Sequence, residues 1–242
     1  MMMARLSSYI LSLPACPCRR ASSSLCSSFS TTSSYTRTVA ATEADLGDLG
    51  RRAGAHLAAH YQCSDVRVND GAPRSYPHCI LLTGHPGAGK TVFARGLIRE
   101  LADVAASAGG IPSPTFCLDF GYPIDAERHP ALAMAFPHGV HHLDLYRLSG
   151  ATRSDLQSLD FFELTERAVM LVEWPDRLGH AGVALPGALK VNIQLQDDRE
   201  KEDGEGDGML TEAMMEKWIS QPRTITLTPT SASSSVWSQL PL

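Results

Sequence analysis

The sequence lacks the long apolar runs from which membrane-spanning helices are built. No stretch of the 242-residue chain approaches the run of about eighteen apolar residues that a transmembrane helix needs. Cysteine is also sparse after residue 42, since Cys63, Cys79 and Cys117 are far apart and match no zinc-binding spacing. We therefore expect no membrane segment, no cysteine-based zinc site and no disulfide framework. The length suits one globular domain with additions at its ends.

Lysine is scarce too, and the net charge is negative, which bears on nucleic-acid binding. The chain has a formal net charge of −5 and only four lysines, which are Lys90, Lys190, Lys201 and Lys217. Proteins that bind nucleic acid by themselves usually neutralise phosphates with clustered lysine and arginine. We therefore predict no strong independent nucleic-acid binding.

Acidic residues are missing from residues 1–42. This segment holds four arginines, no Asp or Glu, and many serines and threonines. Such a composition is typical of a transit peptide that is removed after import into a mitochondrion or a plastid. We exclude the segment from the fold and predict an organellar protein; a cytoplasmic protein follows if the segment is only a disordered tail. Removal of the four positive charges takes the net charge from −5 to −9.

The rest of the chain alternates predicted helices and strands. Apolar residues at helical spacing predict helices over 43–61 and 90–106, and Ser154 as an N-cap predicts another over 154–167. Apolar runs predict strands at 79–82, 115–120, 140–146, 169–172, 189–195 and 224–227. The alternation predicts a single α/β domain, with a P-loop NTPase-like sheet and helices on both faces.

Several segments interrupt that pattern. Turn-forming residues at 64–77 and weak periodicity at 124–139 predict two loop insertions in a domain that spans 43–196. Residues 197–222 form an acidic low-complexity insertion, whose DDREKEDGEGDG run is too charged to bury. Solvation is the favoured role of that run, and an acidic docking patch is the alternative. Residues 223–242 supply the final strand and a tail.

The clearest chemical signal is GHPGAGKT at residues 84–91, which matches the GxxxxGKT pattern of a P-loop. Glycines allow a tight backbone whose N–H groups point toward phosphates. Lys90 can reach the β and γ phosphates, and the Thr91 hydroxyl can hold magnesium. We predict a site for ATP or GTP with Mg²⁺, with contacts from Gly84, Gly87, Ala88, Gly89, Lys90 and Thr91.

A P-loop needs an acidic partner near the end of a neighbouring strand, and two residues are candidates. Glu173 follows the apolar run 169–172, which places it at the carboxyl end of a buried strand, where ligands of open α/β sheets bind. Asp144, in HHLDLYRL, can share the magnesium or activate water. The adjacent His141 and His142 are interpreted as structural or supporting residues, because no metal-ligand spacing completes a set with them.

A third candidate is Thr115 in the sequence SPTF. It follows the P-loop helix through a glycine-rich connection, where GTPases keep a nucleotide-sensing switch. From the residues alone, a proline-braced turn before a strand is the favoured interpretation.

The ordered blocks GHPGAGKT, SPTF, HHLDLYRL and LVEWPDRL resemble the TsaE (YjeE) family, the P-loop ATPase of tRNA threonylcarbamoyladenosine biosynthesis. The resemblance covers roughly residues 42–196 and resumes at residue 223. It implies ATP hydrolysis that supports modification of adenosine 37 of tRNA, together with TsaB-like and TsaD-like partners. By position it implies magnesium on Thr91 and Glu173, a catalytic or magnesium-linked carboxylate at Asp144, nucleotide sensing at Thr115 and a nucleotide contact at Glu43.

These observations predict a magnesium-dependent ATPase, slow when alone, with Lys90, Asp144 and Glu173 as catalytic residues. A P-loop kinase for a small metabolite is one alternative, although no arginine-rich lid segment is visible in the sequence. A nucleotide-switched binding module without appreciable turnover is the other. The choice of ATP over GTP rests on the resemblance, since no NKxD sequence is present to indicate guanine.

Overall fold

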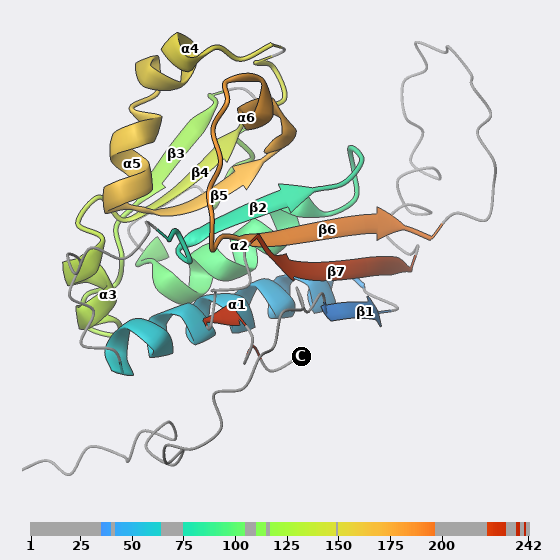
Figure 1. The fold of residues 1–242 in the computed structure, drawn as a ribbon. Helices are drawn as coiled ribbons and strands as arrows, with labels where there is room; N and C mark the ends of the chain where they lie inside the picture. Colours follow the sequence, from blue (N-terminus) through green and yellow to red (C-terminus); the bar gives the residue numbers. More distant parts are fainter. Residues whose placement is uncertain are drawn as a thin grey trace, which may run out of the picture.

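A mixed seven-stranded sheet organises the chain, with strand order β1-β7-β6-β2-β5-β4-β3 (Figure 1). The computed structural model describes residues 35–39, 42–63, 75–104, 110–114, 117–148, 150–196, 222–230, 236–237 and 240. The strands are β1 (Tyr35–Val39), β2 (Cys79–Thr83), β3 (Asp119–Tyr122), β4 (Val140–Asp144), β5 (Val169–Glu173), β6 (Leu189–Leu195) and β7 (Arg223–Pro229). The predicted α/β class is confirmed.

The centre of the sheet is parallel and its edges are antiparallel. Strands β6, β2, β5 and β4 run parallel to one another, whereas β3 pairs antiparallel with β4, β7 with β6, and β1 with β7. Every residue of β5 is buried, as expected for a strand covered on both faces. In β6, by contrast, Leu189, Val191 and Ile193 are buried while Lys190 and Gln194 are exposed. One face of the β6 end is therefore open to solvent.

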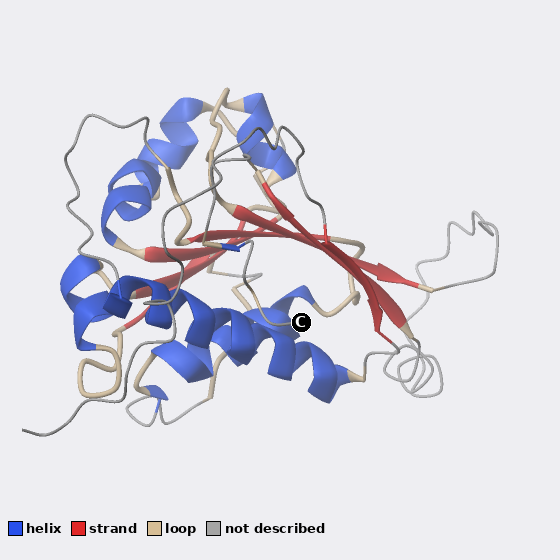
Figure 2. Ribbon diagram, turned by 60° about the horizontal axis from the view of Figure 1, so that its bottom comes forward, coloured by secondary structure: helices blue, strands red, loops and turns tan. Residues whose placement is uncertain are grey.

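Helices cover both faces of the sheet, as predicted (Figure 2). One face carries α1 (Glu43–Cys63) and α2 (Lys90–Leu101), with the short α3 (Pro130–Ala135) packed on α1. The other face carries α4 (Arg153–Ser158), α5 (Phe161–Arg167) and α6 (Asp176–His180). Each face buries its own hydrophobic cluster, so the sheet separates two cores.

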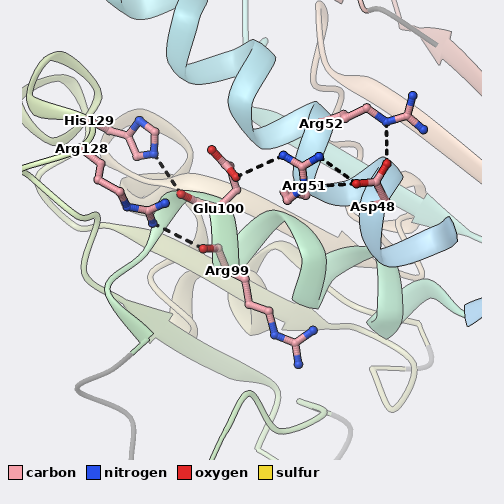
Figure 3. A network of polar contacts seen from close by, with 7 residues as sticks. All are labelled: Asp48, Arg51, Arg52, Arg99, Glu100, Arg128 and His129. Carbon is pink, nitrogen blue, oxygen red and sulfur yellow. Dashed lines mark hydrogen bonds and ion pairs between the residues drawn. The ribbon is translucent and has the colours of Figure 1, made fainter. Parts of the chain in front are cut away.

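Polar contacts join the outer surfaces of α1, α2 and the turn before α3 (Figure 3). Arg51 lies between Asp48, at 2.8 Å, and Glu100, at 3.9 Å. Arg128 and His129 donate hydrogen bonds to backbone carbonyls in the last turn of α2. Exposed ion pairs of this kind contribute little stability each. The hydrogen bonds to the backbone carbonyls are more important here, because carbonyls at the C-terminal end of α2 have no hydrogen-bond partner within the helix.

Some elements differ from the predictions. Helix α2 ends at Leu101, not at residue 106, because Ala102 is extended and forms a bridge to Ile124. The helix predicted over 154–167 is two helices. Thr152, not Ser154, caps the first with a capping box, and Asp160, at φ 52°, separates the two.

The segment 124–139, predicted as a loop insertion, contains α3 and contributes to the core. Leu132 and Phe136 are buried against the α1 and α2 side of the sheet. The strand predicted over 115–120 begins at Asp119, and α6 was not predicted. For α3, the burial of Leu132 and Phe136 shows that tertiary packing, not a local pattern, decides the element.

The edge strand β1 falls inside the segment predicted to be a leader. It pairs antiparallel with β7, and Val39 stands opposite Arg223. The other residues of 1–41, the stretch 64–74 and the acidic insertion up to residue 221 lie outside the described residues. The leader and the acidic insertion stay predictions. Within the described ranges, no helix is both long and apolar enough to cross a bilayer.

Candidate functional site

The phosphate loop connects β2 to α2, as the sequence predicts. Gly87 and Gly89 have φ values of 76° and 106°, a region that side-chain-bearing residues rarely enter. A Cβ atom on Gly89 would also collide with the side chain of Leu46. The backbone of the loop can therefore take its turn only with glycine at this position.

A cavity of about 430 Å³ opens beside this loop. It lies where the strands β4 and β5 end, which is the usual ligand position in an open α/β sheet. Its lining residues are Pro86, Gly87, Gly89, Lys90, Thr91, Val92, Ser113, Asp144, Tyr146, Glu173 and Trp174. The structure thus brings Lys90, Thr91, Asp144 and Glu173 together in one cavity.

Lys90 is buried at the start of α2. Its Nζ atom donates hydrogen bonds of 2.9 Å to the carbonyls of Gly84 and His85, and it lies 4.3 Å from the centroid of the Trp174 ring. Burial lowers the pKa of the Lys90 ammonium, while the nearby carboxylates Glu173 and Asp144 raise it. The ammonium is held at the loop, within the cavity that would take phosphates.

Two side chains contact the carboxylate of Glu173. Its Oε1 atom accepts a hydrogen bond of 2.8 Å from the Thr91 hydroxyl and lies 2.9 Å from His142 Nε2. Glu173 is 4 % exposed and His142 is fully buried. A carboxylate so deeply buried needs such partners. The structure therefore places His142 directly behind Glu173, in keeping with its interpretation as a supporting residue.

Asp144 stands beside Glu173 at the end of the neighbouring strand. The two residues are register partners in the parallel pair β4 and β5. The Asp144 Oδ1 atom accepts a hydrogen bond of 2.9 Å from the Tyr146 backbone N–H, which fixes the rotation of its carboxylate. Two carboxylates and the Thr91 hydroxyl thus offer oxygen ligands, the type that Mg²⁺ prefers.

Magnesium binding would depend on few protein groups. In the described part of the chain, no group of three or more His, Cys, Asp or Glu side chains is arranged so that it could hold a metal ion by itself. Magnesium usually takes one or two carboxylates and completes its shell with water and substrate phosphates. The donor set at Thr91, Glu173 and Asp144 fits that kind of site.

Four predicted contacts lie elsewhere or are not described. Gly84 lines a separate pocket, together with His85 and Trp174. Glu43 is exposed and lines a neighbouring groove between α1 and α2, which shares only Val92 with the cavity. Thr115 lies outside the described residues, although Ser113 of the same SPT sequence lines the cavity. Ala88 is fully buried, and its carbonyl points to another partner, Arg223. The roles of Glu43 and Thr115 stay predictions.

Sequence reasoning gave Trp174 and Tyr146 no part in the site. Trp174 has a φ of 60°, its N–H donates to the Leu82 carbonyl, and its ring centroid is 4.9 Å from that of Tyr146. Both residues line the cavity. The only available signal was their place next to the predicted acids, since an aromatic residue after a buried strand is more often a packing residue.

A protein family and a solved structure are similar to this chain. The family model for TsaE, described as threonylcarbamoyl adenosine biosynthesis protein TsaE, matches residues 41–204. Among solved structures, the crystal structure of YdiB from Bacillus subtilis is similar, with 18% sequence identity and a TM-score of 0.46. That alignment covers 87% of this chain and 95% of the YdiB chain. No curated protein matches the sequence.

Proposed function

The chain belongs to the TsaE family of threonylcarbamoyl adenosine biosynthesis proteins, and we propose that it is a magnesium-dependent ATPase. The family is of the P-loop NTPase type and takes part in forming threonylcarbamoyladenosine in tRNA. The ATPase activity, the metal and the TsaB-like and TsaD-like partners are the proposal. We also propose that the protein works in an organelle, on the composition of residues 1–42.

The observation that carries the proposal is the 2.8 Å hydrogen bond between the Thr91 hydroxyl and Glu173, with Asp144 in register beside it. Thr91 and Glu173 would hold the magnesium, and Asp144 is near enough in the sheet to share it or to orient water. Bound Mg·ATP would supply the phosphoanhydride bond, and its magnesium ion would neutralise part of the charge on the phosphates.

The residues of the chain then act mainly by position and charge. Loop N–H groups bind the phosphates, and Lys90 donates to phosphate oxygens in place of the carbonyls that it contacts now. Asp144, with one oxygen held by the Tyr146 N–H, orients the attacking water and accepts its proton. Phosphoryl transfer demands little else of a protein beyond positioning and electrostatic stabilisation.

The cavity lining also supports slow turnover by the isolated protein. Among the described residues that line it, Lys90 is the only basic side chain. P-loop enzymes that hydrolyse rapidly usually add an arginine, from the same chain or from a partner, and this arginine raises kcat by about 10³-fold or more. A partner that inserts a cation would supply what this lining lacks. The same lining disfavours a kinase, which shields transfer with a lid of arginines.

The test is phosphate release from ATP by the full chain, alone and with candidate TsaB-like and TsaD-like subunits. We expect magnesium-dependent turnover that rises with the partners. Lys90→Ala should lose nucleotide binding, whereas Glu173→Gln should keep much of the binding and lose turnover. A wild-type rate of turnover in Glu173→Gln would contradict the role assigned to Glu173. Turnover that does not depend on magnesium would contradict the proposed metal site.

Two further outcomes separate the alternatives. Tight ATP binding without phosphate release under any combination of partners would favour the nucleotide-switched binding module. Normal threonylcarbamoyladenosine in organellar tRNA after loss of the gene would contradict the proposed organellar role, even if the protein hydrolyses ATP.

A further inference from the structure

An arginine from the last strand reaches the back of the phosphate loop. Arg223 is the first residue of β7 and is only 4 % exposed. Its Nε atom donates a hydrogen bond of 3.0 Å to the carbonyl of Ala88, which is 135 residues away in the sequence. Ala88 itself is fully buried, between Gly87 and Gly89. The guanidinium therefore lies behind the loop and not in the cavity.

Arg223 contacts the peptide group between Ala88 and Gly89, whose N–H would face a bound phosphate. The Ala88 carbonyl and the Gly89 N–H belong to the same peptide plane, and in a trans peptide they point in opposite directions. Arg223 holds the carbonyl on the buried side. The Gly89 N–H is thereby turned the other way, and Gly89 lines the cavity. In a phosphate-binding loop, this orientation of backbone N–H groups is what binds the anion.

Packing leaves the arginine little freedom. A Cβ atom on Gly89 would come 3.7 Å from Arg223 Nε, and Leu46 of α1 closes the same space. Burial lowers the pKa of the guanidinium, and the Glu43 carboxylate opposes this change. A buried cation is costly unless specific partners compensate it. For Arg223 these partners include the Ala88 carbonyl and the Glu43 carboxylate.

We propose that Arg223 is a positioning residue for the phosphate loop: it holds the Ala88 carbonyl so that the Gly89 N–H points toward the phosphates of a bound nucleoside di- or triphosphate. The inference rests on the proposed function, because it requires nucleotide phosphates in this loop. It adds a residue from β7, outside the GHPGAGKT sequence, to the group that determines nucleotide affinity.

The test compares Mg·ADP binding by the full-length wild type, Arg223→Gln and Arg223→Lys. Titration calorimetry gives the Kd, and thermal unfolding without nucleotide reports any purely structural loss. We expect Arg223→Gln to bind about tenfold more weakly or worse, as for loss of a charged hydrogen-bonding group. Arg223→Lys, which keeps the charge but not the planar Nε–H, should lie between. Arg128→Gln, an exposed arginine with a similar bond to a carbonyl, should keep the wild-type Kd.

A wild-type Kd in Arg223→Gln would overturn the inference, whatever its unfolding temperature. If that variant does not fold, the Nε–H resonance of Arg223 in ¹⁵N-labelled wild type decides, assigned by its loss in Arg223→Lys. A shift of this resonance at saturating Mg·ADP supports the inference, and an unchanged resonance overturns it. If the wild type binds Mg·ADP but does not hydrolyse ATP, the proposed ATPase activity is contradicted. The test of Arg223 is still valid in that case, because it measures only nucleotide binding.

Discussion

One oxygen of Glu173 links the loop, the sheet and a buried histidine. Thr91 and His142 both contact Oε1 of this carboxylate, so its orientation is set before any ligand binds. A carboxylate accepts hydrogen bonds and does not donate them, so the His142 Nε2 atom carries the donated proton. Polar groups that are preorganised in this way do not have to reorient during a reaction, so no free energy is lost to their rearrangement.

We predict that His142→Leu lowers the rate of phosphate release by about tenfold to a hundredfold, the range expected for a lost hydrogen bond to a charged group. The Kd for Mg·ATP should change far less, because the phosphate loop is untouched. His142→Gln, whose amide can still donate, should recover part of the rate. His141, which contacts Asp119 at 2.8 Å instead of Glu173, supplies the matched control. Equal losses in His141→Leu and His142→Leu would contradict this role.

A second buried histidine makes the fold sensitive to acid. His78 donates to the Thr165 carbonyl and packs 4.5 Å from the Phe136 ring, and burial lowers its pKa from 6.5 to about 4. Between these values the unfolded chain binds a proton that the folded chain does not. Stability is therefore present above pH 6.5 and is lost as the pH falls toward 4, by about 3 kcal/mol in total.

Urea unfolding at several pH values between 4 and 7.5 measures this loss. His78→Gln keeps a donor for the Thr165 carbonyl and cannot titrate, so its free energy of unfolding should depend less on pH over this range. The exposed His180, replaced by glutamine, should leave the wild-type dependence unchanged. A His78→Gln variant with the full wild-type slope would assign the acid sensitivity to other groups.

Among the helices and strands, those with strong local patterns are the ones that the sequence predicts well. The buried strand before the P-loop, the strand ending at Glu173 and the helix from Glu43 all have apolar spacing that no other structure satisfies as well. The elements that were missed depend on distant contacts. The end of α2 is set by the bridge from Ala102 to Ile124, and α3 by burial of Leu132 against α1.

The same distinction holds within the site. Lys90, Thr91 and Glu173 follow from a motif and from their place at a strand end, so they could be predicted. Arg223 could not be assigned to the loop, because only the pairing of β7 with β6 brings it there from 135 residues away. Sequence spacing carries no information about such a contact without the topology of the sheet.

The two longest helices pack so closely that glycine is required between them. A Cβ atom on Gly50 would collide with the Phe93 carbonyl, whereas a Cβ atom on Gly47 would meet nothing within 4 Å. We predict that Gly50→Ala destabilises the protein by about 1–3 kcal/mol, as overpacking does. Gly47→Ala, on the same helix, should be neutral or stabilise by up to about 1 kcal/mol.

Chemical denaturation of the two alanine variants gives this comparison directly. The change in helix propensity is the same in both variants. The difference between their free energies of unfolding therefore measures the clash with α2. Equal free energies of unfolding would mean that α1 and α2 separate at little cost, and the close packing would not be needed for the fold.

At the scale of the whole molecule, both ends of the described chain join the folded domain. Trp237 is 2 % exposed, and its indole N–H donates to the Pro77 carbonyl just before β2. The carbonyl of the preceding Val236 accepts a bond from His56 of α1. At the other end, β1 extends the sheet beyond β7. These segments have no apolar periodicity, which is why the sequence indicated only a leader and a tail.

The position of β1 leads to a prediction about the mature protein. If the leader ended at residue 42, removal would strip β1 from the sheet and expose the edge of β7, on which Val39 pairs with Arg223. Exposed strand edges promote association between chains. If the proposed leader is cleaved, we therefore expect the new N-terminus at or before Tyr35, which leaves β1 in place. Mass spectrometry of the protein purified from its cells would locate this N-terminus.

Two purified forms, starting at Tyr35 and at Glu43, differ only in the segment that contains β1. The longer form should have the higher Tm, by several degrees, since each kcal/mol is worth about 2–4 °C in a chain of this size. It should also bind Mg·ADP more tightly, because β1 supports the strand whose first residue holds the phosphate loop. Identical Tm and Kd values, together with a mature N-terminus at Glu43, would show that β1 is no part of the working protein. The active domain would then begin at α1, and Arg223 would have to hold the loop from an exposed edge strand.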